Sequence, residues 1–236
     1  MRDFFKSIFF KREKFSFGAA VLTLTTLLSY ITGLLRDRIF ARTFGAGREL
    51  DLYNASFEIP DLILNVLVSS ALSAAFIPIF SSLIGAGEKE KANRLANTVL
   101  HSAVVMIFVF GVIAAIVMPL ILKITKPGFT GIEHERLVDL SRLMLISPLI
   151  MAVSSSLGAM LVSYKRFLPY GISPILYNLG IICGTFTTAY FGVYGLVLGT
   201  LLGAALHLAP RLAVIKSTPF KYNFAVALKD AHFIRV

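Results

Sequence analysis

Two groups of charged and polar side chains interrupt otherwise apolar stretches of this sequence. The first is Arg36-Asp37-Arg38, which follows the uncharged stretch Phe17–Leu35. A guanidinium binds phosphate oxygens in a planar, bidentate geometry, so Arg36 in a cavity would suit a phosphate ligand. The alternative is an interfacial anchor, in which the long side chain extends to the lipid headgroups. Helical spacing places four residues on one face of this first helix: Ser29, Gly33, Arg36 and Asp37.

The second group, called the polar stripe below, lies on the second predicted helix and extends into the next apolar segment. Its members recur at steps of three or four residues, the spacing of one helical face: Asn54, Glu58, Asp61, Asn65, Ser69 and Ser73. Because a charge at membrane depth costs about 3 kcal/mol or more, this face is expected to line a wet cavity or to pack on another polar helix. Glu58 and Asp61 would suit a coupling cation there. Asp51, near the start of the helix, suits either a helix-capping role or a role in transport.

No enzyme motif accompanies these residues. The sequence contains no phosphate-binding P-loop, no HExxH zinc motif and no G-x-S-x-G nucleophile elbow. Glu133-His134-Glu135 is interpreted as a solvated loop and not as a metal site, and the single cysteine, Cys183, as a small buried apolar residue. The sequence therefore predicts a protein that is not an enzyme and has no catalytic residue, metal or cofactor.

The elements that position these residues are predicted to be membrane-spanning helices. Hydrophobic residues make up 56% of the chain and charged residues 15%, against about 25% charged in soluble proteins. Several stretches reach the length of about 20 apolar residues that a span needs. They are Phe17–Leu35, Leu62–Gly87 (its helix beginning near Asp51), Leu95–Leu122, Leu143–Tyr164 and Phe167–Pro210, the last long enough for two helices divided near Tyr190–Gly195. The fold class is therefore all-α, a polytopic membrane protein with six transmembrane helices.

The basic residues indicate how these helices are oriented. The formal net charge is +10, and the loops on the side of the N-terminus carry most of the Lys and Arg residues, including Arg211 after the sixth span. Because cytoplasmic loops are enriched in basic residues, both ends of the chain are predicted to be cytoplasmic. Nucleic acid is not an expected partner, because no soluble domain carries a basic stripe, and membrane lipid is the expected neighbour.

The later spans carry residues suited to helix packing. Gly195, Gly199 and Gly203 are spaced by four and lie on one helical face. Small residues let a neighbouring helix approach closely, so this face is predicted to pack against another helix. Asn178 and His207 are interpreted as hydrogen-bonding residues between helices and not as ligands.

The polar residues fall in segments that resemble the MurJ/MviN family of lipid II flippases, part of the superfamily of multidrug, oligosaccharidyl-lipid and polysaccharide exporters. The densest match extends from Ser29 to Pro78. The matching motifs keep their order along almost the whole chain: Gly33–Asp37, Phe44–Gly47, Asp51, Phe57–Pro60, Ala71–Pro78, Lys126–Phe129, Lys165–Phe167 and Pro174–Asn178.

The resemblance implies two six-helix lobes around a V-shaped central cavity, of which this chain would be the first. It divides the chain into a basic cytoplasmic segment (1–15), a six-helix lobe (16–215) and a linker toward a seventh helix (216–236). The implied substrate is lipid II, a lipid-linked oligosaccharide, carried across the bacterial cytoplasmic membrane by alternating access. The missing C-terminal lobe or a second copy would be the partner. The implied substrate-binding residues are Arg36, Asp37, Asp51, Glu58, Asp61 and Asn65.

The chain departs from the family pattern at the polar stripe and beside it. Tyr30, Leu64 and Asn65 occupy positions where the family has arginine, Ser69 replaces a family glutamate, and Glu58 occupies a frequently basic position. Either the other lobe supplies the missing cations or the cargo differs. The alternatives are therefore an exporter of another polyprenyl-linked glycan or of an amphipathic cation, and a half-size membrane partner that transports nothing.

Overall fold

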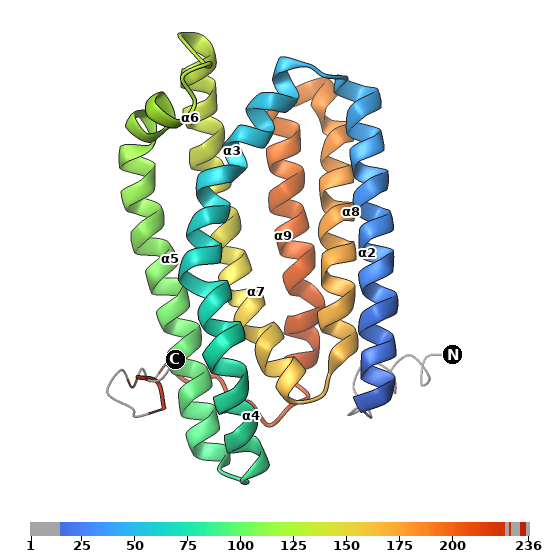
Figure 1. The fold of residues 1–236 in the computed structure, drawn as a ribbon, viewed down its shortest axis with the longest axis vertical. Helices are drawn as coiled ribbons and strands as arrows, with labels where there is room; N and C mark the ends of the chain where they lie inside the picture. The colour runs from blue at the N-terminus through green and yellow to red at the C-terminus, as the bar shows by residue number, and fades with distance from the viewer. Residues whose placement is uncertain (1–14, 225–226, 228–231, 235–236) are drawn as a thin grey trace.

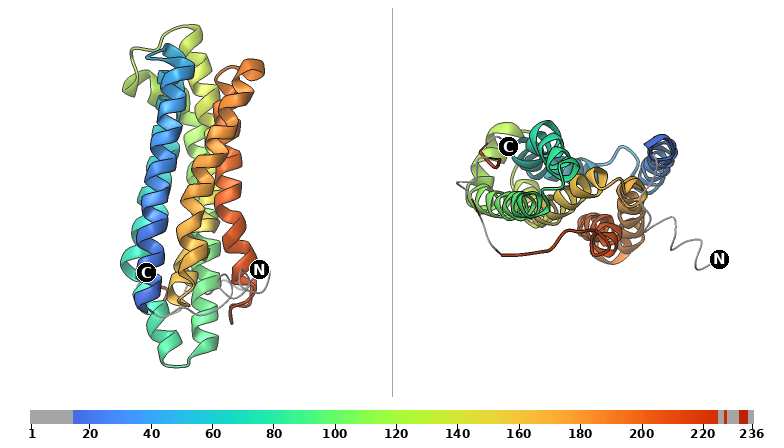
Figure 2. Two further views of the ribbon diagram at one scale, coloured as in Figure 1. Left: turned by 90° about the vertical axis from the view of Figure 1, so that its right-hand side faces the viewer. Right: turned by 90° about the horizontal axis from the view of Figure 1, so that it is seen from below.

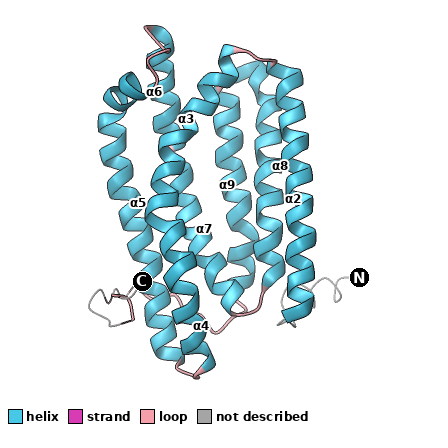
Figure 3. Ribbon diagram, in the orientation of Figure 1, coloured by secondary structure: helices cyan, strands magenta, loops and turns pink. Residues whose placement is uncertain are grey.

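The computed structural model describes residues 15–224, 227 and 232–234, and these form long helices and connecting turns without a strand (Figures 1 and 3). The basic segment before Phe15 lies outside the described residues. In chain order the elements are α2 (Phe15–Phe44), α3 (Arg48–Leu64), the π-helical segments η1 (Asn65–Ser69) and η2 (Leu72–Phe76), α4 (Ile77–Gly85), α5 (Lys89–Thr125), α6 (Ile132–Met144), α7 (Ile146–Ser163), α8 (Phe167–Phe191) and α9 (Tyr194–Ile215).

Six helical stretches of the described chain are long and apolar enough to cross a membrane, which confirms the predicted number. Several of them are longer than the apolar runs indicated, and two extend the furthest beyond those runs. α2 continues past Leu35 to Phe44, and the fourth span begins at Ile132 instead of Leu143. Both extensions carry charged residues, because a helix can continue beyond the apolar layer into the interface. The prediction of a loop at 133–135 was therefore wrong, since these residues form the first turn of α6.

The helices form two groups that meet at α7 (Figure 2). One group contains α2, α8 and α9, with α8 packed against both of the others, and the second contains α3, α4 and α5. α7 packs against both α5 and α9. α2 and α3 are joined by a short turn and separate from each other toward the end of the bundle where α2 begins and α9 ends (Figure 1). α2 therefore makes few contacts with α3.

Glycines set the distance between α8 and α9. A methyl group added at Gly184 would lie 2.5 Å from the Cα atom of Gly199, and one added at Gly180 would lie 2.4 Å from the Cα atom of Gly203. The backbones are thus in direct contact at two successive turns. The structure confirms that the glycine face of the sixth span packs closely against a neighbouring helix.

An arginine lies inside the bundle near the end of α9. Arg211 was predicted in a loop, and this was wrong: α9 continues through Pro210 to Ile215, and Arg211 is only 3% exposed. Its Nη1 donates to the Ser154 carbonyl oxygen at 2.7 Å, and its Nε donates to Ser173 Oγ at 3.0 Å. His207 shares this cluster, with its Nδ1 2.8 Å from Ser154 Oγ. His207 therefore joins α7 to α9, as predicted for a residue that hydrogen-bonds between helices.

The cysteine prediction was wrong as well, because Cys183 is exposed on α8. In a membrane protein an apolar sequence context does not imply burial, since lipid tails are as apolar as the protein core and one face of each outer helix can contact them.

The segment that follows α9, residues 216–224, is extended from Phe220 onward and lies along α5. Asn97 of α5 is buried, and its Nδ2 donates to the Lys221 carbonyl oxygen at 2.9 Å. Asn97 Oδ1 accepts from the Asn223 backbone N–H at 2.8 Å, and Asn93 Oδ1 accepts from the Lys221 N–H at 2.8 Å. One carboxamide thus satisfies both a donor and an acceptor of the extended backbone, which fixes the post-α9 segment to the bundle.

Candidate functional site

The central residue of the candidate site is Arg36, which α2 presents toward α8. Its Nε and Nη2 donate to Asp37 Oδ1 at 3.0 and 2.9 Å, and its Nη1 donates to Asn178 Oδ1 at 3.0 Å. The Arg36 side chain is 28% exposed and that of Asp37 is 60% exposed. The guanidinium is therefore held in one orientation while part of it stays accessible.

Asn178 positions Arg36 from the neighbouring helix. Its Nδ2 donates to the Ser29 carbonyl oxygen at 3.3 Å and lies 3.5 Å from Thr32 Oγ1, so both ends of the amide are used. The prediction that Asn178 forms hydrogen bonds between helices is confirmed. Its contact with Arg36 could not be found from the sequence, because the two residues are far apart in the chain and belong to different apolar runs.

A cavity of about 440 Å³ opens beside Arg36, between α2 and the first turns of α3. Arg36 and Asp37 line it together with aromatic residues on its walls, and the polar stripe reaches it at Asn54. Tyr53 is buried, and its hydroxyl donates to Thr200 Oγ1 at 2.9 Å, because the Thr200 hydroxyl already donates to the Leu196 carbonyl. The walls are thus rigid and apolar, and the charged groups lie at one side.

The polar stripe lies on the open face of α3, η1 and η2. All of its members are exposed except Ser69, which is half-buried. The π-helical segments account for this alignment. An α-helix has 3.6 residues per turn, so side chains spaced by four residues move gradually around its axis in one direction. The wider turns of a π-helix move them in the opposite direction and so keep the stripe on one face. The sequence showed the spacing of Asn65, Ser69 and Ser73, but no propensity signal indicated the π-helices.

The two carboxylates of the polar stripe differ in their partners. Glu58 forms an ion pair with Lys126 at the end of α5. Asp61 accepts a hydrogen bond of 3.0 Å from Asn65 Nδ2 and lines a small cavity of about 40 Å³ beside Tyr177. Asp61 has no basic partner among the described residues. Asp61, and not Glu58, is therefore the stripe carboxylate that is available to a cationic ligand.

Asp51 lies apart from the other predicted site residues. It is exposed in the first turn of α3, next to the charge of Arg48, and does not line the cavity beside Arg36. Arg48 itself pairs with Glu133 of α6 at 2.8 Å, and Arg136 of α6 pairs with Glu49 at 2.9 Å. These pairs attach α3 to α6. The structure thus brings Arg36, Asp37 and the start of the polar stripe together, and leaves Asp51 at the helix end.

The described residues contain no group of three or more His, Cys, Asp or Glu side chains placed to hold a metal ion. The arrangement beside Arg36 has a guanidinium and hydrogen-bonding amides but no nucleophile with an adjacent base. Its geometry suits binding of an anionic group by charge and hydrogen bonds.

Comparisons with known proteins agree on one family. The family model described as lipid II flippase MurJ matches residues 40–236. The lipid II flippase MurJ of Thermosipho africanus is 28% identical over 215 residues, which cover 89% of this chain and 43% of that protein. The probable lipid II flippase MurJ of Borreliella burgdorferi is 27% identical over 198 residues, 82% of this chain and 38% of that protein. The chain thus spans about two fifths of the length of these relatives.

Solved structures show the same fold. A structure of lipid II flippase MurJ in an inward closed conformation superposes with a TM-score of 0.73 at 25% identity, covering 91% of this chain and 45% of that one. A transporter of the MOP superfamily from Pyrococcus furiosus also gives a TM-score of 0.73, at 17% identity, covering 94% of this chain and 50% of that one. The six-helix arrangement described above is therefore the arrangement of half of such a transporter.

Proposed function

This chain belongs to the lipid II flippase MurJ family, and from that premise we propose that it forms the first lobe of a flippase for lipid II, the lipid-linked precursor of peptidoglycan. The lobe works by alternating access together with a second six-helix lobe, supplied by a longer chain or by a second copy. No covalent chemistry is involved, since the cargo only changes leaflet.

The observation that carries the proposal is the state of Arg36. A guanidinium has five N–H groups, and three of them donate to Asp37 and Asn178. The remaining two are available for a pyrophosphate oxygen at the edge of a cavity of about 440 Å³. Because its plane is already fixed by two side chains, Arg36 loses little conformational freedom when it binds the phosphate. Asp37 and Asn178 are positioning residues in this account.

The divergence of α2 and α3 supports the same proposal. The two helices meet at the turn around Gly45, which adopts a φ of 58° that favours glycine. From there they separate (Figure 1), and the residues of the polar stripe are exposed or half-buried. A second lobe placed against these residues would close a path along Asn54, Asp61 and Asn65, with Arg36 near its narrow end. Asp51 would act at the rim, where the two lobes part.

The orientation in the membrane follows from the basic residues. Several described Lys and Arg residues lie at the end of the bundle where α2 begins and α9 ends. They are Lys89, Lys91, Arg94, Lys165, Arg166, Lys216 and Lys221. Counted over the whole sequence, the loops and chain ends on this side carry most of the Lys and Arg residues, although the described residues alone show no such excess. Because cytoplasmic faces are enriched in Lys and Arg, we infer that this end is cytoplasmic and that the lobe of a bacterial inner-membrane protein opens toward the leaflet where its cargo is made.

An exporter of an amphipathic cation is the second candidate, and the carboxylates of the polar stripe are the observation in its favour. Lys126 neutralises Glu58, which leaves Asp61 as the stripe carboxylate without a basic partner among the described residues. One carboxylate in a small cavity is a smaller feature than the oriented Arg36, so the anionic cargo is the better supported one.

The test is a flipping assay with the full-length protein as the only flippase in the cell. Lipid II that reaches the outer leaflet is cleaved by a hydrolase that cannot cross the membrane, and the cleaved fraction is measured. Arg36→Ala should abolish most cleavage, whereas Arg38→Ala, which removes a neighbouring exposed charge outside the cavity, should retain it. Normal cleavage in the Arg36→Ala variant would rule out the proposed role of this residue.

A further inference from the structure

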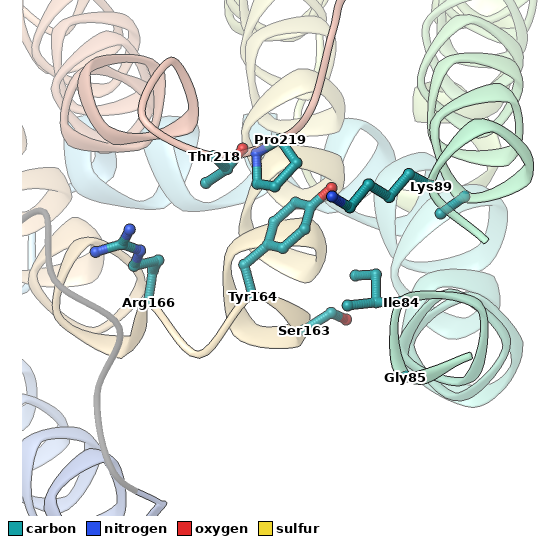
Figure 4. Close-up of a pocket in the computed structure, with 9 residues that line it drawn as sticks. Ile84, Gly85, Lys89, Ser163, Tyr164, Arg166, Thr218 and Pro219 are labelled. Carbon is teal, nitrogen blue, oxygen red and sulfur yellow. The ribbon is translucent and has the colours of Figure 1, made fainter. Parts of the chain in front are cut away.

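Two of the cavities away from Arg36 lie near opposite ends of the bundle, and they differ in charge. At the end where α9 ends, a cavity of about 450 Å³ is lined by Lys89 and Arg166 and by no Asp or Glu (Figure 4). At the opposite end, a cavity of about 660 Å³, called the α5–α6 cavity below, lies between the end of α5 and the start of α6. Its lining contains Lys123 of α5 and Glu135 of α6. None of the residues proposed to bind lipid II lines it, so this site is independent of the lipid II proposal.

The two opposite charges of the α5–α6 cavity are not paired. Neither the Lys123 nor the Glu135 side chain has an ion-pair or hydrogen-bond partner in the part of the chain that the structure describes. Charged residues close to them in sequence do form ion pairs with α3. These pairs are Lys126 with Glu58, Glu133 with Arg48, and Arg136 with Glu49. A ligand that carries both a negative and a positive group can therefore contact both walls of the cavity without displacing an existing pair.

Two arginines hold the walls of the α5–α6 cavity in place. Arg48 stacks on the ring of Phe129, which lines the cavity, with its guanidinium carbon 4.1 Å from the ring centre. Pro119 has no backbone N–H, which leaves the Ala115 carbonyl of α5 without its usual helical donor. Arg142 of α6 takes the place of that donor, since its Nε donates to the Ala115 carbonyl oxygen at 2.9 Å. The helices on the two sides of the cavity are thus directly joined.

The α5–α6 cavity lies at the level of lipid headgroups. Lys123 is the first charged residue after Leu95–Leu122, a stretch of α5 without Asp, Glu, Lys or Arg, so it marks the end of the apolar part of this span. Leu120 lines the cavity and is 61% exposed, and Ile116, one helical turn deeper, is 71% exposed. An apolar surface therefore continues from the cavity toward the middle of the membrane, where acyl chains lie.

We propose that the α5–α6 cavity binds a zwitterionic phospholipid whose headgroup carries an ammonium group, as phosphatidylethanolamine does. The lipid phosphate contacts Lys123, the ammonium group donates hydrogen bonds to Glu135, and an acyl chain lies along Leu120 and Ile116. A headgroup with a phosphate alone would leave Glu135 unpaired beside a second negative charge, so the lining favours the zwitterion. The volume of about 660 Å³ is in the range of pockets that bind small ligands.

The test is native mass spectrometry of the full-length protein, delipidated in neutral detergent and titrated with three lipids that have the same acyl chains. Phosphatidylethanolamine has both charges and an N–H donor, phosphatidylcholine has both charges without an N–H donor, and phosphatidylglycerol has the phosphate without a positive charge. Phosphatidylethanolamine should bind about fivefold more tightly than either of the others, the upper end for contacts between exposed charges. Equal affinities for the three lipids, or a preference for phosphatidylglycerol, would overturn the proposal.

Variants assign each charge of the headgroup to its partner. Lys123→Gln should lower the affinity for phosphatidylethanolamine and phosphatidylglycerol, whereas Glu135→Gln should lower the affinity for phosphatidylethanolamine alone. Both residues are exposed, so these variants should fold. The matched control, Arg42→Gln/Asp139→Asn, removes one charge of each sign from exposed residues outside the cavity and should leave the lipid preference unchanged. A Glu135→Gln variant that keeps the preference for phosphatidylethanolamine, or a control that loses it, would overturn the proposal.

Discussion

The contact between α8 and α9 leads to the most quantitative prediction, for the substitution Gly184→Ala. The added methyl carbon would lie 2.5 Å from the Cα atom of Gly199 and 2.7 Å from the Gly195 carbonyl oxygen. Non-bonded carbon atoms prefer about 3.5–4.0 Å, so the two helices must separate by about 1 Å at this point. Neither neighbour is a side chain that can rotate away, because both are backbone atoms.

The expected cost is that of an overpacked core, about 1–3 kcal/mol. It would lower the midpoint of thermal unfolding by about 2–4 °C for each kcal/mol. The double variant Gly184→Ala/Gly199→Ala should cost less than the sum of the two single variants, because the first methyl group has already separated the helices.

The assay is thermal unfolding in detergent, with Gly111→Ala as the matched control. Gly111 also lies inside a long helix, α5, but a methyl group there would meet no atom within 4 Å. The control should be as stable as the natural protein or more stable by up to about 1 kcal/mol, since alanine favours a helix over glycine. Equal midpoints for Gly184→Ala and Gly111→Ala would show that the backbones of α8 and α9 are not in contact.

Three further predictions concern side-chain contacts. Asn178→Ala removes the hydrogen-bond acceptor that α8 provides for Arg36, and a hydrogen bond to a charged group is worth about 1.5–3 kcal/mol. The affinity for the pyrophosphate lipid, measured by native mass spectrometry titration, should therefore fall about tenfold or more. Unchanged affinity would contradict the positioning role of Asn178. A double-mutant cycle on Glu49 and Arg136 should give a coupling energy of about 1 kcal/mol or less in unfolding experiments, because both side chains are more than a third exposed. A coupling energy several times larger would show that this ion pair is not weakened by solvent. Asn97→Ala removes two hydrogen bonds to the post-α9 segment, so trypsin should cleave after Lys221 about tenfold faster or more. An unchanged cleavage rate would show that these hydrogen bonds do not hold the segment against the bundle.

The parts of the fold that depend on hydropathy could be predicted from the sequence. The length of apolar stretches determines how many helices can span a membrane, and the spacing of Gly195, Gly199 and Gly203 determines which face can approach a neighbour. Helix ends were less predictable. α6 and the end of α2 are helical where the sequence is charged, because helix continuation into the interface is not governed by hydropathy.

Contacts between distant residues could not be predicted. Arg211 looked like a loop residue because it is the first charge after the uncharged run Phe167–Pro210, yet polar partners from α7 and α8 allow its burial. The pairing of Glu58 with Lys126 changes the charge of the polar stripe, and it joins residues from different helices. The roles of Arg36, Asp37, Asp51, Asp61 and Asn65 in substrate binding remain predictions that the geometry supports to different degrees, most for Arg36 and least for Asp51.

Native mass spectrometry of the full-length protein, extracted from its own membranes, can show whether a lipid-linked pyrophosphate is bound at Arg36. We expect a bound polyprenyl-pyrophosphate glycan that is retained in the Arg38→Ala variant and reduced by about tenfold or more in Arg36→Ala, as expected for loss of a charge-assisted contact. A protein that carries only bulk phospholipid, or an Arg36→Ala variant that retains the glycan fully, would contradict it.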